Sequence, residues 1–379
     1  MTLLPAAVEP FAPATYRRRL RDVAGEAGRR GVEALLVTPS PDYAYLLGYR
    51  APALERLTCL VLPATGMPSL VLPRLEEPLA RHELGSLAES VELLSWDETD
   101  DPFQLVRGLL EGITGRVGVQ DQMWARFVLR LRAALDPIEL VEAGPSIAAL
   151  RRLKSPEEVG RLRSAAAAAD AAMEQITAEP LSGRSEAQVS RRINELLLAA
   201  GHETADFAIV ASGPNSASPH HVPGERVIEP GDAIVLDIGG ALGGYCSDTS
   251  RTAFVGEPAA DFAALYAVLR EAQAAACEAV APGVPADAVD AAARQAITEA
   301  GYGERYIHRT GHGIGMETHE EPYIVSGNAE PLQAGYAFSV EPGIYIEGQW
   351  GARIEDIVVC TDAGGERLNR SSRELYLVD

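Results

Sequence analysis

The sequence is poor in basic residues relative to acidic ones. Lys and Arg number 33 against 54 Asp and Glu, which gives a formal net charge of −21 at pH 7. Nucleic acids and anionic membrane surfaces attract the opposite charge, so neither is expected as a partner. We expect the acidic balance to serve solubility, although a basic protein partner would also suit it.

Paired cysteines and long apolar runs are also lacking. The four cysteines form no CxxC pair and no disulfide framework, which predicts buried thiols in a reducing compartment. The N-terminal stretch MTLLPAAVEPFAPA has no basic leader and contains an acid and three prolines, so it is a poor signal peptide. The longest apolar stretch, residues 263–281, contains three charged residues and is too polar to span a membrane. We therefore expect a cytoplasmic protein. The cysteines are Cys59, Cys246, Cys277 and Cys360.

Residues 1–148 are predicted to form a smaller α/β domain. The length of 379 residues suits two or three domains at roughly 150 residues each, and a hydrophobic content of 47% is enough to build their cores. The apolar runs VEALLVT, CLVLP, SLVLP, VELLSW and RVGVQ alternate with helical segments, as in a sheet covered by helices. No glycine-rich phosphate loop follows any of these runs.

A connection at about residues 146–160 leads into a second predicted domain, residues 149–379. Two capping boxes, Ser155-Pro156-Glu157-Glu158 and Ser185-Glu186-Ala187-Gln188, each predict the start of a helix. A strand and a hairpin at residues 233–255 follow. Two further helices, at residues 259–280 and 286–300, precede a second hairpin at residues 337–360. The order helix, helix, hairpin thus occurs twice, which predicts two similar halves.

The first of these hairpins carries a pair of aspartates. If Leu242 and Gly243 are the central turn residues, Asp237 lies opposite Asp248 on the same face, with Cβ atoms about 4.5–5.5 Å apart. Two aspartates inside an apolar strand pair would repel each other and lose solvation, and a bound cation removes both penalties. The alternative is a solvated hairpin with two surface acids.

The second hairpin carries a pair of glutamates. Glu341 and Glu355 lie seven residues to either side of Gly348, and His312 lies nearby in TGHGIGMETHE, where its flanking glycines allow a close backbone approach. Glycosidases need only two carboxylates, whereas this set has four and an imidazole. Four carboxylates balance two divalent cations, and such ligands suit Mn²⁺, Co²⁺ or Fe²⁺, with Zn²⁺ also possible. Two such ions share a nucleophilic water, which indicates hydrolysis.

These residues resemble the pita-bread metallopeptidases, which include methionine aminopeptidase, Xaa-Pro aminopeptidase, prolidase and the metal-free creatinase. The resemblance extends from IAALRRLKSPEEV to the end, with SASPHHVPG, VLDIGGALGGYCSDTSRT, TGHGIGMETHEEP, VEPGIYI and GARIED as its most specific strings. It implies an α+β protein whose C-terminal pita-bread domain of two similar halves follows a creatinase-like α/β domain. Such an N-terminal domain is typical of the prolidase, Xaa-Pro aminopeptidase and creatinase branch. A homodimer, whose N-terminal domains can reach the neighbouring active site, is also implied.

The resemblance implies a role for each site residue. His220 would contact the substrate near the scissile bond, and His319 would bind the carbonyl oxygen or the tetrahedral intermediate. Glu341 would also take a proton from the bridging water, and Arg353 would support the cluster or the substrate. The two metal ions would be held by Asp237, Asp248, His312, Glu341 and Glu355.

Three other histidines are expected to lie outside the site. Strand alternation would turn His221 to the opposite face from its neighbour, and His202 and His308 are expected to be surface or loop residues.

The implied substrate is a small peptide with proline at its second position. An Xaa-Pro bond has no N–H to satisfy, so the enzyme needs a pocket shaped for the ring. Phe207, Tyr323 and the glycines around His312 are expected to line it. Several resembling prolidases have an arginine where Tyr323 stands, and no Lys or Arg occurs at residues 320–349. Either another arginine, for example from the N-terminal domain or a partner subunit, binds the C-terminal carboxylate, or longer peptides are accepted.

The short chain resembles compact bacterial prolidases, and this resemblance favours Xaa-Pro dipeptides, with an Xaa-Pro aminopeptidase as the alternative. A creatinase-like hydrolase without metal should lack ligands, and all five are present. A binding module without activity has no chemical reason to keep four clustered acids.

Overall fold

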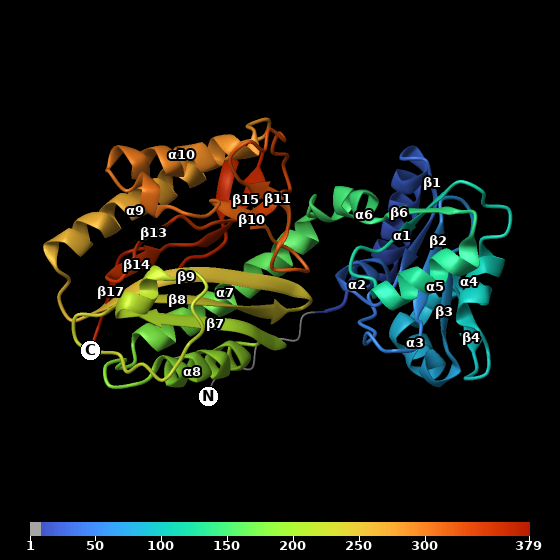
Figure 1. Cartoon of the computed structure of the whole chain (residues 1–379), viewed down its shortest axis with the longest axis horizontal. Helices are drawn as coiled ribbons and strands as arrows, with labels where there is room; N and C mark the ends of the chain where they lie inside the picture. Colours follow the sequence, from blue (N-terminus) through green and yellow to red (C-terminus); the bar gives the residue numbers. More distant parts are fainter. Residues whose placement is uncertain (1–8) are drawn as a thin grey trace. The chain divides into compact units, whose positions relative to one another are not determined.

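The computed structural model describes residues 9–379, which form two compact units, Glu9–Arg151 and Arg152–Asp379 (Figure 1). No helix among these residues is long and apolar enough to cross a membrane. All four cysteines are buried, and none of them forms a disulfide bond among the described residues, as the sequence predicts.

The N-terminal unit is built around a mixed six-stranded sheet with the strand order β4-β3-β2-β1-β5-β6. Its strands are β1 Val32–Val37, β2 Cys59–Pro63, β3 Ser69–Pro73, β4 Glu92–Trp96, β5 Arg116–Val119 and β6 Glu139–Glu142. Its helices are α1 Pro13–Arg29, α2 Pro41–Leu47, α3 Glu77–Leu84, α4 Pro102–Leu109, α5 Ala125–Leu135 and α6 Gly144–Arg151, with short 3₁₀ turns at Arg74–Glu76 and Gly85–Ser90. The predicted α/β arrangement is confirmed.

The central position of β1 in the sheet explains its burial. Five of its six residues are buried, because β1 pairs with β2 on one side and β5 on the other and is covered on both faces. Ala34 and Leu36 pack in one core with Phe103 of α4 and Leu131 of α5. This unit therefore has a hydrophobic core of its own.

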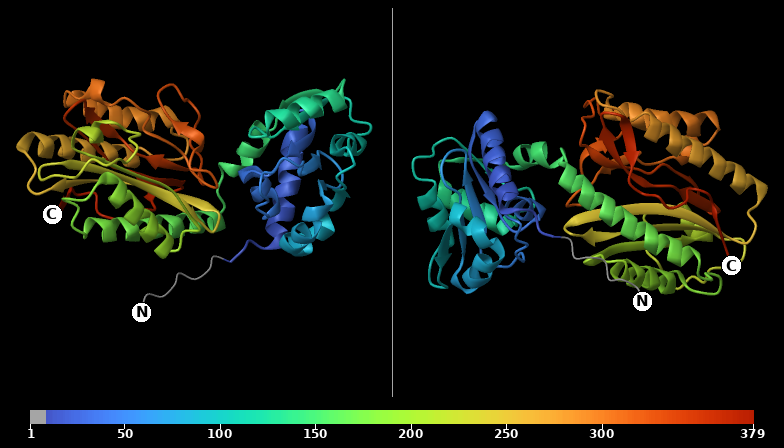
Figure 2. Two further views of the ribbon diagram at one scale, coloured as in Figure 1. Left: turned by 60° about the horizontal axis from the view of Figure 1, so that its bottom comes forward. Right: turned by 180° about the vertical axis from the view of Figure 1, so that it is seen from behind.

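In the C-terminal unit the strands lie between two pairs of helices, α7 with α8 and α9 with α10 (Figures 1 and 2). The first half contains α7 Pro156–Thr177, α8 Glu186–Ala199, β7 Thr204–Ser212, a 3₁₀ turn at Gly213–Ala217, β8 Ala233–Leu242 and β9 Tyr245–Val255. The second half contains α9 Ala260–Glu278, α10 Ala286–Glu299, a 3₁₀ turn at Gly303–Arg305, β10 Gly311–Gly313, β11 Glu320–Ile324, β12 Ala337–Val340, β13 Gly343–Ile346, β14 Trp350–Arg353, β15 Asp356–Thr361, β16 Gly364–Arg367 and β17 Tyr376–Val378. The repeated order of a helix pair and paired strands is confirmed.

Both predicted capping boxes are formed. The Ser155 Oγ accepts from the Glu158 backbone N–H at 3.3 Å, and the Glu158 carboxylate accepts from the Ser155 N–H at 2.9 Å. Ser185 and Gln188 make the same pair of bonds at the start of α8. These bonds satisfy amide groups that a helix start otherwise leaves open.

The turn of the first hairpin lies one residue later than predicted, which shifts the strand register by two residues. The central turn residues are Gly243 and Gly244, with φ of 57° and 85°, rather than Leu242 and Gly243. A tight hairpin turn of this kind needs positive φ at both central positions, which two glycines adopt without strain. Asp237 therefore pairs with Ser250, and Asp248 pairs with Gly239. The offset is two residues, so both aspartates still share one face of the sheet.

The hairpin predicted at residues 337–360 is divided into two ladders. β12 pairs with β15, and β13 pairs with β14, so Glu341 and Glu355 lie at the break between the ladders. Pro342 has no N–H to donate at this point. The Glu341 N–H donates instead to the Thr310 carbonyl at 2.8 Å, and the Glu355 N–H donates to the Ser250 carbonyl at 3.0 Å. The break thereby brings both glutamates next to His312 and the first hairpin.

Candidate active site

A cavity of about 580 Å³ in the C-terminal unit brings the predicted site residues together. All of them line it except Tyr323 and the glycines beside His312. The remaining wall residues carry no signal in the sequence that was read as functional, and they are Ile209, Pro219, His308, Arg309 and Thr318.

Acidic oxygens and one imidazole nitrogen converge in this cavity. The His312 Nε2 lies 3.1 Å from the Glu341 Oε1 and 3.6 Å from the Asp248 Oδ2. One donor atom each from Asp248, His312 and Glu355 lies within 4.8 Å of the other two, and all three residues are buried. Such spacing allows the three side chains to bind one cation.

Two carboxylate oxygens show that a cation fits here. The Asp237 Oδ1 and the Glu355 Oε1 are buried and have no hydrogen-bond partner among the described residues. Buried polar atoms in proteins are almost always partnered, and an orphaned carboxylate oxygen amid other acids suits a positive ion. The oxygen-rich donor set with one imidazole suits a divalent transition metal.

The acids disturb one another's protonation. Burial raises the pKa of Asp248 well above its usual range, and the charges of Glu355 and Asp237 raise it further. Burial and the charge of Glu341 likewise raise the pKa of Glu355. For Glu341, hydrogen bonding and positive charge from His312 outweigh burial and lower the pKa to about 2. A divalent cation would stabilise the ionised form of all these groups.

Arg353 of β14 lies against the acids and is 2% exposed. Its Nη2 donates to the Asp237 Oδ2 at 2.6 Å, and its Nε donates to the Ser250 Oγ at 2.9 Å. The Ser250 hydroxyl in turn donates to the Glu355 carboxylate at 2.8 Å. Arg353 therefore orients two of the predicted ligands.

A buried carboxylate next to the N-cap of α8 organises the segment carrying His220, a role that the capping-box pattern does not predict. Glu186 accepts from the Ser212 N–H at 2.8 Å and from the Asn215 side-chain amide at 3.0 Å. Its other oxygen lies 2.7 Å from the His221 Nε2. His220 lines the cavity and His221 does not, as expected, but the two residues lie in a turn and the following loop, so strand alternation is not the reason.

His319 lines the cavity, and its ring centroid lies 4.1 Å from that of His312. Partial burial lowers the pKa of His319 to about 4, helped by the positive charges of His312 and Arg309. At neutral pH its imidazole is uncharged, so one ring nitrogen can donate a hydrogen bond.

Two other histidines lie in loops, as expected, but His202 is buried and His308 belongs to the cavity wall instead of lying outside the site. His202 is 4% exposed, with its Nε2 2.8 Å from the Ser247 Oγ, because Ser247 alternates with Asp248 and points to the opposite face of β9. His308 lines the cavity, and its Nε2 lies 3.0 Å from the Tyr345 hydroxyl. That hydroxyl also accepts from the Arg353 Nη1 at 2.9 Å.

The predicted substrate residues are separated. Phe207 of β7 lines the cavity, and its ring lies so close to Gly239 that a Cβ there would come within 2.4 Å of it. Tyr323 pairs with His312 across β10 and β11, and its ring is 37% exposed outside the cavity wall. The Arg309 guanidinium lies over this ring, 4.5 Å from its centroid.

The glycines beside His312 serve strand packing rather than the pocket. A Cβ on Gly311 would lie 1.8 Å from the Ser339 carbonyl oxygen, and one on Gly313 would lie 2.3 Å from the Glu321 carbonyl oxygen. The close approach expected from the sequence is therefore to the neighbouring strands β12 and β11.

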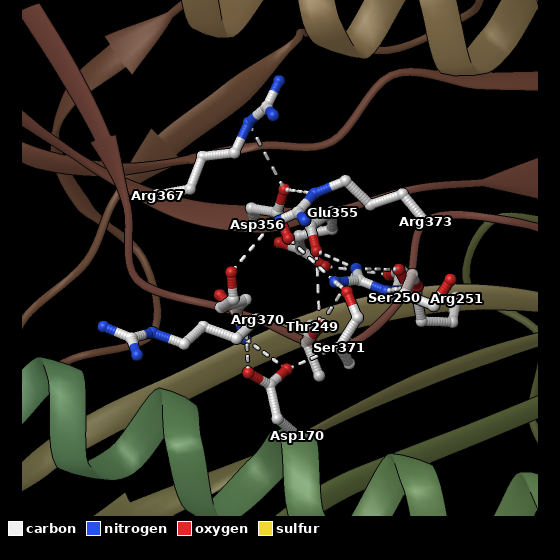
Figure 3. A network of polar contacts seen from close by, with 12 residues as sticks. Asp170, Thr249, Ser250, Arg251, Glu355, Asp356, Arg367, Arg370, Ser371 and Arg373 are labelled. Carbon is white, nitrogen blue, oxygen red and sulfur yellow. Dashed lines mark hydrogen bonds and ion pairs between the residues drawn. The ribbon is translucent and has the colours of Figure 1, made fainter.

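A buried charge network supports the strand that follows Glu355 (Figure 3). The Arg251 side chain is fully buried and donates to the Glu355 carbonyl at 2.5 Å and to the Asp356 carboxylate at 2.9 Å. Asp356 also accepts from the Arg373 Nε at 2.6 Å. The C-terminal segment is held in the same network, because the Asp170 carboxylate accepts from the Ser371 hydroxyl at 2.7 Å. The network fixes the backbone of Glu355 from behind the cavity.

Known proteins share this architecture along the whole chain. Metallopeptidase family M24 matches residues 160–362, and the creatinase/prolidase N-terminal domain matches residues 18–153. A probable dipeptidase PepE of Mycobacterium tuberculosis is 46% identical over 370 residues, covering 97% of this chain and 98% of that protein.

Solved structures agree with these matches. The dipeptidase PepE from Mycobacterium ulcerans has a TM-score of 0.92 and 46% identity, covering 98% of this chain and 100% of that one. A prolidase from Thermococcus sibiricus has a TM-score of 0.89 and 37% identity, covering 95% of this chain and 98% of that one. The matched family is one of metallopeptidases. The chain therefore belongs to metallopeptidase family M24, with a creatinase-type N-terminal domain before a pita-bread domain.

Proposed function

We propose that this protein hydrolyses Xaa-Pro dipeptides with the help of two divalent metal ions. The observation that carries the proposal is the convergence of four carboxylates, two buried and two partly buried, and one imidazole on a single cavity, with two carboxylate oxygens left unpartnered. The similarity to a prolidase and to dipeptidases supports the choice of substrate.

Asp237, Asp248, His312, Glu341 and Glu355 are the proposed ligands. Two ions are proposed because the donor atoms of Asp248, His312 and Glu355 lie close enough for one ion, while the free oxygen of Asp237 and the second carboxylate at Glu341 leave donors for another. When bound, such ions lower the pKa of a water that they share and polarise the scissile carbonyl. Mn²⁺ and Co²⁺ are the proposed metals, and Fe²⁺ and Zn²⁺ also suit the donors.

The protein's own groups supply the proton chemistry. Glu341 is ionised at neutral pH, because its pKa is lowered to about 2, so its carboxylate can accept a proton from the attacking water. The neutral His319 can donate a hydrogen bond to the carbonyl oxygen as negative charge develops there. His220 lines the same cavity and is proposed to contact the substrate at the scissile bond. Arg353 keeps Asp237 in place.

Phe207 is proposed to form part of the pocket for the proline ring, since its aromatic side chain lines the cavity.

The proposed alternative is an Xaa-Pro aminopeptidase for longer peptides. It is favoured by Tyr323, which stands where several resembling prolidases carry an arginine for the substrate carboxylate. We also propose that the protein works as a cytoplasmic homodimer, which sedimentation of the purified protein would test.

The deciding assay uses metal-stripped protein reloaded with Mn²⁺ or Co²⁺ and given Ala-Pro, Leu-Pro, Ala-Pro-Ala and the control peptide Ala-Leu. We expect metal-dependent release of proline from the two Xaa-Pro dipeptides and slower cleavage of the other two. In D248N, whose side chain has the same size but no charge, kcat should fall by about 10³-fold or more, and the metal content should fall with it. Cleavage of Ala-Leu alone would refute the Xaa-Pro specificity, and equal rates with and without metal would refute the metal mechanism.

A further inference from the structure

Two guanidinium groups line the cavity, and only one of them is committed to the acids. Arg353 is buried and binds Asp237, as described above. Arg309 is half-buried, and no acid among residues 9–379 forms an ion pair with it. A permanent positive charge thus stands in the wall of a cavity that is otherwise rich in carboxylates.

The backbone at Arg309 is held firmly on both sides. Its carbonyl lies 2.7 Å from the His308 Nδ1. The next residue, Thr310, donates its N–H and its hydroxyl to the buried Asp290 carboxylate at 3.0 and 2.8 Å. The side chain therefore starts from a fixed point immediately before β10, which carries His312.

The ring of Tyr323 holds the far end of the side chain. The guanidinium carbon lies 4.5 Å from the ring centroid. Stacking on an aromatic face orients the planar guanidinium and uses none of its five N–H donors. These donors remain available to a ligand, and a guanidinium offers two parallel N–H groups that match the two oxygens of a carboxylate.

The geometry points to Arg309 as the residue that recognises the free C-terminal carboxylate of a dipeptide substrate, with Tyr323 as its positioning residue. This inference rests on the proposed function and decides between its two forms. With the four acids engaged by the proposed metal ions, Arg309 is the cationic side chain of the cavity wall that can meet a substrate carboxylate, because Arg353 is bound to Asp237. Such a cation would select dipeptides, because in a longer peptide the residue after proline replaces the charged carboxylate with an amide.

The test compares Ala-Pro with its C-terminal amide, using the full-length, metal-loaded protein. We expect the wild type to favour Ala-Pro in kcat/KM by about 10-fold or more. In R309M, kcat/KM for Ala-Pro should fall by about 10- to 100-fold, the loss typical of a charged hydrogen bond, while the value for the amide stays nearly unchanged. R309K should retain part of the preference. Y323F, which keeps the ring, should match the wild type, and Y323L should lose preference.

Binding of L-proline and L-prolinamide, measured by calorimetry, repeats the comparison without turnover. The wild type should bind proline more tightly than prolinamide, and R309M should bind the two alike. The inference is overturned if R309M keeps the wild-type preference, or if it weakens the acid and the amide equally at unchanged metal content. Failure of the proposed function is a different result, namely a wild type that distinguishes proline from prolinamide but cleaves no Xaa-Pro bond.

Discussion

Glu186 is a single carboxylate on which the position of a whole segment depends. It is fully buried, and it receives hydrogen bonds from Ser212, Asn215 and the Gly224 N–H, besides its contact with His221. Burial would raise its pKa, but the bonds from Asn215, His221 and Ser212 outweigh that effect and lower it below the usual value of 4.5. The charged form of Glu186 therefore stabilises the fold.

This lowered pKa predicts a pH dependence for E186Q. An acid whose pKa is lower in the folded state contributes stability above its unfolded pKa, and the contribution disappears as the pH falls through the folded pKa. We therefore expect the free energy of unfolding of the wild type to fall as the pH drops below 4.5, and to fall less in E186Q. Urea denaturation at several pH values measures this.

At pH 7, E186Q should be about 1–3 kcal/mol less stable, because a neutral amide accepts the same hydrogen bonds less well. The matched control is E195Q, which changes an exposed acid of the same helix and should alter neither quantity. Parallel pH curves for E186Q and the wild type would contradict the interpretation.

Among the elements, β10 shows how strand packing places a functional side chain. This strand of three residues lies between β11 and β12, and glycines on both sides of His312 allow the neighbouring backbones to come close. The position of the imidazole thus depends on residues with no side chain.

We expect G311A to displace β10. Its new methyl group would lie 1.8 Å from the Ser339 carbonyl oxygen, so one of the two strands must move. Stability should fall by about 1–3 kcal/mol, as for overpacked cores, and kcat/KM should fall with it because His312 moves.

Thermal unfolding and peptide hydrolysis measure the two effects. G160A serves as the control, since an added Cβ there meets nothing within 4 Å and Gly160 lies inside α7, where alanine favours the helix. If G311A is as stable and active as G160A, the packing argument is wrong.

The whole chain contains two units with separate cores, and all five proposed ligands lie in one of them. A ligand that binds only the folded state stabilises the unit that binds it. Metal should therefore stabilise the C-terminal unit directly.

Calorimetric unfolding of the full chain tests this with and without Mn²⁺. At a free metal concentration 100 times the Kd, we expect the C-terminal transition to gain about 2.7 kcal/mol, and a chelator to reverse the gain. In D237N/D248N the metal should have no effect. A metal-induced shift that survives in this variant would place the binding site elsewhere.

Local chemistry in the sequence was sufficient to predict much of this protein. The two capping boxes, both helix pairs and the first hairpin depend on neighbouring residues, so their signals are readable in the chain. Acidic residues that interrupt apolar strands likewise indicate a functional site, because burying a carboxylate without a counter-charge is costly in free energy. On these grounds the sequence indicated four acids and one histidine that the structure brings to one cavity.

Only the tertiary structure decided the remaining features. The register of the first hairpin depends on which two residues form its turn. These are Gly243 and Gly244, which both have positive φ, and counting residues from an assumed turn could not identify them. Burial of His202, the contacts of Glu186 and the place of Arg309 in the wall all involve partners distant in sequence. Such contacts depend on how the strands and helices pack against one another. A local sequence pattern does not predict which distant side chains this packing brings into contact.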